Sequence, residues 1–530
     1  MASACLAPAS AAAEECALVE SRSSLAQLSG VRIAAVDIVA EGASLPGPAR
    51  ALNGLHVVSR DATIRRQLLF AAGDTVDTLR VSETMRRLRR GRLFSDVVVA
   101  ARRCSANGAV TLVVRSRDVW TMRPTARLKT PSLLSFGFED KNILGTGRTV
   151  AVTHEMSMRG RGAALSVTDP WVLGQDVAGN LRIASLGGAH AFRAGIRKHE
   201  YSVFDRWRAE VNVARLSFGD TVATERALHT LDAMTLVGRR VGHAVTSATT
   251  LLAGAEFDSA ASVPSASRAL VTSGPRARSF VGLDIGLLRR TAQFDTASWV
   301  VPGRGFLDVP LGWETDVVVA AGRERVVGTT ALKVDSWLGR VWMPRRGRIL
   351  MADGWVSGFM GRGVSANHIA RASVAWYADA PRGMWGLRAT AEQLVDLDPD
   401  LRGLSLMPLA DYTAPTLPGY VARGGRSVAG SIERSMRVHR VGINSMLDAG
   451  AFLAGSYRWR VEDVPGNALR SGVIGTRLRV LSSNGAVNSM RVDVGYPVVR
   501  SGVLPNRAFA LLTIGTLFDV SRQRDGRRIY

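Results

Sequence analysis

The stretch Trp207-Arg208-Ala209-Glu210-Val211-Asn212-Val213 alternates apolar and polar side chains, with the apolar ones at every odd position. The same alternation recurs at residues 150–158, 385–392 and 489–496, and Gly, Asn, Asp or Pro separate such segments. Successive side chains of a strand point to opposite faces, so this pattern predicts strands with one apolar and one polar face. From about residue 120 onward the chain is therefore expected to be all-β.

Two architectures use such strands: several soluble β-sandwiches, or one barrel that is apolar outside and polar inside. Sandwiches would need linkers between domains, and residues 121–518 contain no Pro/Ser-rich linker. A closed barrel also removes sheet edges, which lipid does not tolerate. Counting the family resemblance described below as well, we predict a transmembrane β-barrel of about 16 antiparallel strands.

A small α+β domain with the order β-α-α-β-β is expected before the barrel, over residues 31–120. Asp61 can cap a helix that ends near Gly73, and Gly91 can stop a second helix. Asn107-Gly108 is a typical hairpin turn between the last two strands. The expected elements are a strand at Val31–Ala40, the two helices from Asp61 and over Ser82–Arg90, and strands at Phe94–Ala101 and Val110–Ser116.

Composition narrows the class of protein. The chain has 530 residues, 46% of them hydrophobic, which argues against disorder, and no apolar run long enough for a transmembrane helix. The net charge is +23, mostly from Arg spread along the chain. Nucleic-acid binding would favour clustered basic residues with aromatics, so we expect no nucleic acid. A cationic lumen, contacts with lipid phosphates, or plain Arg-for-Lys usage explain the charge.

The chain start and the cysteines give weaker signals. Residues 1–30 are interpreted as a signal-peptide remnant and linker, because small residues at 9–13 precede two glutamates; an Ala-rich disordered start is the alternative. Cys16 and Cys104 can form a disulfide in an oxidising compartment. No cysteine has metal-binding spacing, so no metal is expected.

The run Thr63-Ile64-Arg65-Arg66-Gln67-Leu68-Leu69-Phe70-Ala71-Ala72-Gly73-Asp74, followed by Gly91-Arg92-Leu93-Phe94-Ser95-Asp96-Val97, resembles a POTRA domain. The resemblance implies a periplasmic module that captures polypeptide by strand addition. The expected client-binding residues are Arg86, Arg89, Phe94 and Val97. A solvated surface for the arginines and a core position for Phe94 are the alternatives.

The stretch Phe136-Gly137-Phe138-Glu139-Asp140-Lys141-Asn142-Ile143-Leu144-Gly145-Thr146-Gly147 resembles the first barrel strand of the BamA/TamA and two-partner-secretion group, the bacterial surface antigens. Asp169-Pro170 resembles that group's "DP" hairpin, and Leu307–Gly312 a strand entry. An alternating segment near the C-terminus resembles the barrel-closing strand, and a basic tail follows at 519–530. The seam residues implied are Phe136, Phe138, Asn142, Gly145, Leu512, Ile514 and Phe518.

Leu417-Pro418-Gly419-Tyr420 falls where members of this group carry an inward loop with an Arg before the Gly. Here Pro418 replaces that Arg, which puts the usual loop–wall ion pair in doubt. A simple tight turn at this loop is the alternative. The loop and wall residues implied are Gly419, Tyr420, Arg423, Arg426, Glu433 and Asp448, with Arg423 or Arg426 as substitute cations.

No catalytic pattern is present: the sequence lacks G-x-S-x-G, a two-histidine zinc motif and a dinucleotide fingerprint. We therefore expect no enzyme and no cofactor. The resemblance implies an outer-membrane protein of a Gram-negative bacterium, with the small domain in the periplasm. It would act on unfolded clients, with lipids and accessory periplasmic proteins or lipoproteins as partners. A polypeptide secretion pore and a structural surface barrel are the competing functions.

Overall fold

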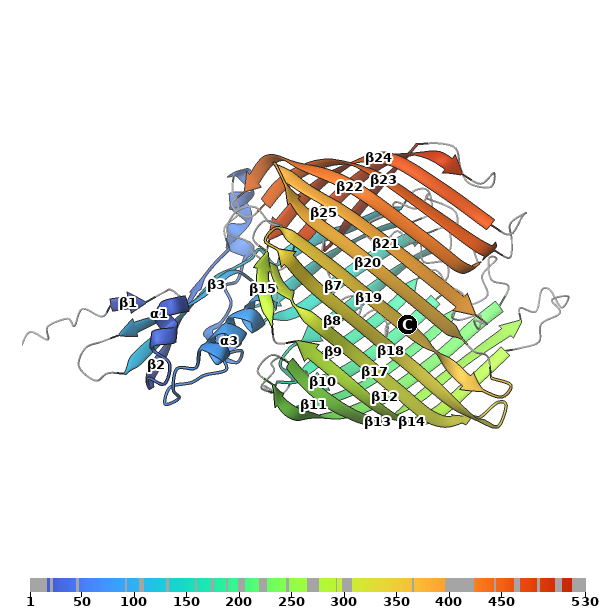
Figure 1. Cartoon of the computed structure of the whole chain (residues 1–530), viewed down its shortest axis with the longest axis horizontal. Coiled ribbons are helices and arrows are strands. Elements are labelled where there is room, and N and C mark those ends of the chain that lie inside the picture. The colour runs from blue at the N-terminus through green and yellow to red at the C-terminus, as the bar shows by residue number, and fades with distance from the viewer. Residues whose placement is uncertain are drawn as a thin grey trace, which may run out of the picture.

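The computed structural model forms a small α+β domain followed by a large β-barrel (Figure 1). No helix in the described part of the chain is long and apolar enough to cross a membrane. The structure describes residues 17–19, 22–43, 47–90, 93–103, 109–129, 133–157, 160–172, 176–186, 189–198, 205–218, 226–244, 247–264, 276–291, 293–297, 307–364, 367–395, 424–442, 445–461, 468–483, 487–500 and 508–516.

The small domain is a four-stranded sheet in the order β1-β3-β4-β2, in which β2 and β4 are parallel. Ile64, Val81 and Leu88 come from the helices and share one buried core with the strand residues. The elements are β1 (Ala17–Val19), α1 (Arg22–Gln27), β2 (Ile33–Glu41), the 3₁₀ helix η1 (Gly47–Leu55), α2 (Asp61–Arg65), α3 (Thr78–Arg90), β3 (Phe94–Arg103) and β4 (Val110–Asp118).

The expected β-α-α-β-β order is present, with three additions. Ala17–Val19 and Arg22–Gln27, assigned from the sequence to a leader and linker, form β1 and α1; β1 pairs with β3, and Leu25 is buried in the core. A three-residue strand and a six-residue helix carry too little periodicity to be recognised. Helix α2 ends at Arg65 rather than near Gly73, and η1 was not expected.

Among the described residues the barrel contains twenty antiparallel strands. They are β5 (Met122–Lys129), β6 (Leu133–Ile143), β7 (Arg148–Ser157), β8 (Gly160–Asp169), β9 (Ala178–Leu186), β10 (Ala189–Lys198), β11 (Trp207–Phe218), β12 (Arg226–Ala244), β13 (Ser247–Pro264), β14 (Arg276–Thr291), β17 (Gly312–Glu324), β18 (Thr329–Arg345), β19 (Arg348–Gly361), β20 (His368–Ala380), β21 (Gly383–Val395), β22 (Gly424–Gly442), β23 (Ser445–Val461), β24 (Ala468–Ser483), β25 (Val487–Arg500) and β26 (Phe509–Thr516).

The strand number exceeds the expected sixteen because many connections are shorter than the sequence estimate assumed. Strands β18 and β19 are joined by Arg346 and Gly347 alone, with Gly347 at φ +81°. Strands β20 and β21 are joined by Pro381 and Arg382, with Arg382 at φ +57°. Residues in the left-handed conformation at two-residue turns match the twist of antiparallel strands. The connections between such strands can therefore be only two residues long.

The small domain lies against one end of the barrel, which we call the near end; the opposite end is the far end (Figure 1). A separate hairpin at the near end, β15 (Phe294–Ala297) and β16 (Leu307–Pro310), forms a two-stranded sheet of its own. It is inserted between β14 and β17, which pair directly with each other. The hairpin is therefore an addition to the barrel and not part of its wall.

Candidate functional site

The outer face of the barrel is apolar. Leu283 and Ile285 on β14 are 71% and 69% exposed, while Asp284 between them is 2% exposed and points inward. The same division holds on β24, where Ile474 and Leu478 are exposed and Arg477 is buried. A continuous exposed apolar surface around a barrel is the arrangement that faces lipid.

Three tryptophans on this outer face lie opposite arginines near the near end of the barrel. Each tryptophan is within the first three residues of its strand, and each arginine is its cross-strand partner on the following strand. The guanidinium carbons lie between 4.9 and 5.5 Å from the ring centroids. The pairs are Trp207–Arg239, Trp313–Arg340 and Trp385–Arg434. Such amphipathic residues mark the level where hydrocarbon gives way to headgroups.

The lumen holds a network of charges around Glu433 on β22. Arg477 on β24 bridges Glu433 and Asp493, with its Nε 2.6 Å from Asp493 Oδ1. Arg479 lies 2.8 Å from Glu433 and 3.7 Å from Asp448. Buried charges that are paired and hydrogen-bonded in this way hold adjacent strands together and fix their register. Glu433 and Asp448 are thus wall acids, as expected, but their cations come from the wall itself.

A second lumen network lies on the other side of the barrel. Lys333 Nζ on β18 is 3.2 Å from Glu256 and 3.0 Å from Asp258, both on β13. Arg278 on β14 also pairs with Asp258, at 2.9 Å. Because β13 and β18 are three strands apart, this cluster braces the concave inner wall.

The barrel closes at a narrow seam. Strand β5 is registered with β6 at eight positions and β26 with β25 at eight, whereas in the described residues β5 and β26 are registered at one position, Leu128 opposite Leu512. Pro124 lies within β5. Proline lacks an N–H and is confined to edge strands in sheets. Over the described residues the seam is thus a single registered pair between two strands that each retain the character of an edge.

Phe136 and Phe138 lie on β6, which pairs with β5 and β7, so the prediction that they form the seam is wrong. The sequence analysis placed the first barrel strand at 136–147 and did not predict β5, which precedes it. Ile514 lies on the closing strand β26 as expected, while Phe518 lies outside the described residues.

Asn142, also assigned to the seam, joins the barrel to the small domain instead. Its side chain is 2% exposed at the β6–β7 turn of the near end. The Nδ2 donates to Ser59 Oγ at 2.9 Å, and the Oδ1 accepts from the backbone N–H of Gly147 at 2.8 Å. Ser59 is held in turn by Asp118, whose carboxylate accepts from the Ser59 N–H at 2.7 Å.

Gly145 completes this domain junction. Its carbonyl accepts from the backbone N–H of Arg60 at 2.9 Å and from Thr63 Oγ at 2.8 Å. Gly145 has φ +72°, and a Cβ at this position would lie 2.4 Å from the carbonyl oxygen of Val58. A glycine is therefore required both by the backbone conformation and by the close approach of the two domains. The resemblance motif at 136–147 serves docking in this structure.

Helix α3 makes a second docking contact, through Arg86, which was expected to bind a client, and its neighbour Arg87. Arg87 pairs with Asp176 at 2.8 Å and lies 5.7 Å from the Trp171 ring, both in the β8–β9 turn. Arg86 pairs with Glu83, and its guanidinium lies 4.4 Å from the ring centroid of Phe294 on β15. These arginines hold the small domain to the barrel.

The other predicted client residues are internal to the small domain. Arg89 donates to the carbonyl of Val97 at 3.1 Å. Phe94 and Val97 are 1% and 0% exposed and belong to the core. Their side chains are unavailable to a client in this conformation.

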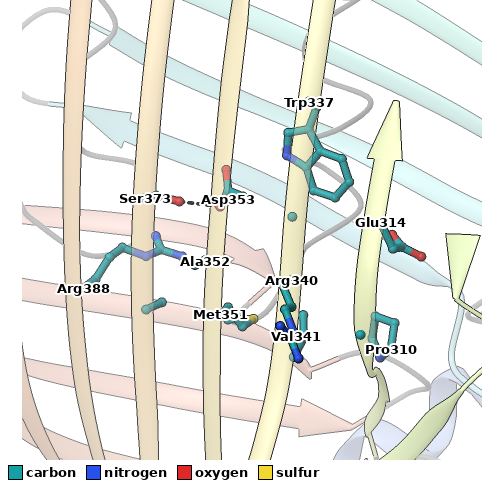
Figure 2. Close-up of a pocket in the computed structure, with 13 residues that line it drawn as sticks. Pro310, Glu314, Trp337, Arg340, Val341, Met351, Ala352, Asp353, Ser373 and Arg388 are labelled. Atoms are coloured by element: carbon teal, nitrogen blue, oxygen red, sulfur yellow. Dashed lines mark hydrogen bonds between the residues drawn. The ribbon is translucent and has the colours of Figure 1, made fainter. Parts of the chain in front are cut away.

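The hairpin β15–β16 sits against the inner wall at the near end. Ala297 and Val309 are buried against lumen-facing residues of β18 to β21, among them Ile349 and Tyr377. Beside it is a cavity of about 30 Å³, bordered by Pro310 at the end of β16 and by Trp337, Asp353, Ser373 and Arg388 of the wall (Figure 2). This volume holds about one or two water molecules and no cofactor.

Several predicted residues lie outside the described part of the chain: Gly419, Tyr420 and Arg423 of the loop, and Cys16 and Cys104. Arg426 is on β22, but Glu433 and Asp448 are paired with Arg477 and Arg479 instead. Within the described ranges no cluster of three or more metal-ligating residues occurs. The contributions of Ser59, Arg60, Thr63 and Arg87 to docking were not recognised from the sequence, because contacts between domains leave no periodic pattern.

Comparison with known proteins gave matches to solved structures only. The chain is similar to CdiB from Escherichia coli (11% identity, TM-score 0.45, 94% of this chain and 80% of that chain) and to CdiB from Acinetobacter baumannii (11%, 0.36, 91% and 74%). It is also similar to BamA from Haemophilus ducreyi lacking POTRA domains 1-3 (13%, 0.34, 92% and 85%). No family model and no curated protein matches. At these identities and TM-scores the similarities carry no conclusion about function, and the chain's own strand pairing defines the fold.

Proposed function

We propose that this chain is an outer-membrane protein that assists the insertion or translocation of polypeptides, with the β5–β26 seam as the place where a client strand pairs. The seam carries the proposal: in the described part of the chain one registered pair joins β5 and β26, whereas eight join each of them to its other neighbour. Unpaired backbone groups along a strand edge are a template for another strand.

The energetics of a membrane favour this use of the seam. An unsatisfied backbone N–H or C=O in lipid costs several kcal/mol. A client strand that pairs with β5 or β26 satisfies groups on both chains, so client folding itself supplies the driving force. The exposed apolar outer face supports a seam that lies in lipid, where that gain would be largest.

The small domain offers a place for first contact with the client in the periplasm. Strand β2 is the outermost strand of its sheet: in the described residues it pairs with β4, and on its other side the backbone of Ile33, at its start, is hydrogen-bonded to Gly73 and Asp74. An extended polypeptide can add to its free edge by the strand-addition mode. This edge, rather than the arginines of α3, is the client surface that the geometry supports; accessory proteins or lipoproteins would act at the same domain.

A secretion pore is the second candidate, favoured by the hairpin in the near-end mouth. A wall that served only to template strands at the seam would need nothing to fill its lumen. A pore that conducts polypeptide would need its mouth closed at rest. The two functions differ in the path taken by the client, along the seam or through the lumen.

A disulfide that locks the seam distinguishes insertion along the seam from secretion through the lumen. In a background with Cys5, Cys16 and Cys104 changed to Ser, the pair Leu128→Cys and Leu512→Cys is oxidised to fix the seam. The control pair Leu128→Cys and Leu134→Cys joins β5 to β6, which are registered there already. The assay follows a urea-unfolded eight-stranded barrel protein added to proteoliposomes. Loss of assisted insertion with the seam lock alone supports the seam function; unchanged insertion with the seam locked refutes it.

A further inference from the structure

The inner wall of the barrel has an apolar area at the near end, which we call the wall patch: Val341, Ile349, Ala375, Tyr377 and Met384. Each of these side chains is at most 6% exposed. Barrel lumens are normally polar, and this one carries ion pairs around Glu433 and Lys333. An apolar area inside such a lumen requires an apolar occupant.

The occupant in this structure is the chain's own hairpin. Ala297 of β15 is 0% exposed and Val309 of β16 is 4% exposed against the wall patch. In the described residues the two hairpin strands pair only with each other, not with any barrel strand. The hairpin is thus held by side-chain packing and lacks the backbone ladder that would fix it permanently.

The barrel does not need the hairpin for closure. Strands β14 and β17 pair directly, so the wall is continuous where the hairpin enters and leaves. The N–H of Leu311 donates to the carbonyl of Gln293 at 2.9 Å across the base of the hairpin, which is the hydrogen bond that the first and fourth residues of a β-turn would make. Residues 294–310 therefore occupy the place of a two-residue turn.

The small domain holds the hairpin from outside. The Arg86 guanidinium lies 4.4 Å from the ring centroid of Phe294, and Glu83 fixes Arg86 from within α3. In Figure 1 β15 lies between α3 and the barrel strands. The wall patch, hairpin and domain form one continuous contact.

We propose that the wall patch is a binding site for an extended client segment that carries small or branched apolar side chains, which the chain's own hairpin fills at rest. This rests on the proposed function, since it names the part of a client that the barrel binds. Ala297 and Val309 show the chemistry accepted: small or β-branched groups that leave no exposed surface. Charged side chains at these positions would be excluded.

The test places a photo-crosslinker in the wall patch. Residues 294–310 are replaced by Asn-Gly, a two-residue turn that suits the Gln293–Leu311 geometry. Tyr377→benzoylphenylalanine in this variant then reports on the emptied patch. Trp376→benzoylphenylalanine, adjacent on β20 and on the opposite face, is the matched control. Heat-modifiable gel migration verifies that each variant is folded.

The probe is a synthetic peptide of residues 293–311, compared with the same peptide carrying Ala297→Asp and Val309→Asp. We expect the unmodified peptide to crosslink at 377 at least about tenfold more than the Asp peptide, and neither at 376. Equal crosslinking of both peptides, or none of either, overturns the binding site. In the full-length chain, Val309→Asp provides a second check: it should reduce the crosslink between 377 and the hairpin.

The unfolded eight-stranded barrel protein serves as the client. In the chain that retains the hairpin, we expect this client to displace the hairpin and to become the species that crosslinks to residue 377. A client that inserts at the normal rate without ever crosslinking at 377 refutes the wall patch and leaves the proposed function standing. Peptide crosslinking at 377 combined with insertion that ignores the seam lock supports the patch and refutes the seam function.

Discussion

Replacing Gly145 by alanine should detach the small domain from the barrel, and Gly328 provides a matched control. Both glycines lie in turns of the barrel at nearly the same φ, +72° and +74°. An added Cβ at Gly145 would lie 2.4 Å from the carbonyl oxygen of Val58, whereas nothing lies within 4 Å of one at Gly328. The two substitutions therefore share the backbone penalty and differ only in the contact between domains.

The magnitude follows from the contacts. A left-handed alanine costs about 1–2 kcal/mol at either position. At Gly145 the turn must also withdraw from Val58, and the hydrogen bonds from Arg60 and Thr63 are lost. Each contributes about 0.5–1.5 kcal/mol, so the docked state loses about 1–3 kcal/mol more. That corresponds to a roughly five- to hundredfold shift toward the undocked state.

Hydrogen exchange at the Arg60 amide measures this shift directly, because that N–H donates to Gly145 across the junction. Gly145→Ala should accelerate exchange at Arg60 by about five- to hundredfold. Gly328→Ala should leave Arg60 unchanged and affect only its own turn. Equal protection of Arg60 in both variants would show that the domain is held by other contacts, and the reasoning would be wrong.

Three further substitutions test the remaining contacts. Arg477→Met leaves Glu433 and Asp493 without their shared cation, so the free energy of unfolding measured with urea should fall by about 3–5 kcal/mol. The control Arg470→Met, on the outer face, should lower it by less than about 1 kcal/mol. Arg340→Gln removes the cation between Trp313 and Trp342 and should cost about 1–2 kcal/mol, with fewer phospholipids retained in native mass spectrometry. Arg87→Ala should broaden the spin-label distance distribution between α3 and the β8–β9 turn, while Arg102→Ala, an exposed cation 3.9 Å from Asp37, should not.

The architecture was predictable because it repeats a local pattern. Alternation at Trp207–Val213 and elsewhere specifies strands whose faces differ, and the structure places those strands in one barrel wall. The small domain was predictable from helix stops and the spacing of core residues such as Leu88 and Phe94. Both signals lie within about ten residues of sequence, the range over which periodicity acts.

The contacts that give the site its properties were not predictable in this way. Glu433 was expected to pair with a loop arginine, but Arg477, 44 residues along the chain, pairs with it instead. Which strand stands two places away in a barrel depends on strand count and register, and no local pattern fixes either. The stretch Leu307–Gly312 was predicted to be a strand entry; β17 does begin at Gly312, but Leu307–Pro310 form β16, which pairs with β15 beside the lumen wall.

Docking of the small domain and seating of the hairpin are coupled through one helix. Arg86 and Arg87 are neighbours on α3; the first contacts Phe294 of the hairpin and the second contacts Asp176 and Trp171 of the barrel. A rotation of α3 large enough to break one contact disturbs the other, so the domain cannot swing away while the hairpin keeps its outer support. Each cation–π contact contributes about 0.5–2 kcal/mol. We call the state with the domain docked and the hairpin seated closed, and the state with both released open. A client that binds the open state a few kcal/mol more tightly than the closed state is then sufficient to shift the population to the open state.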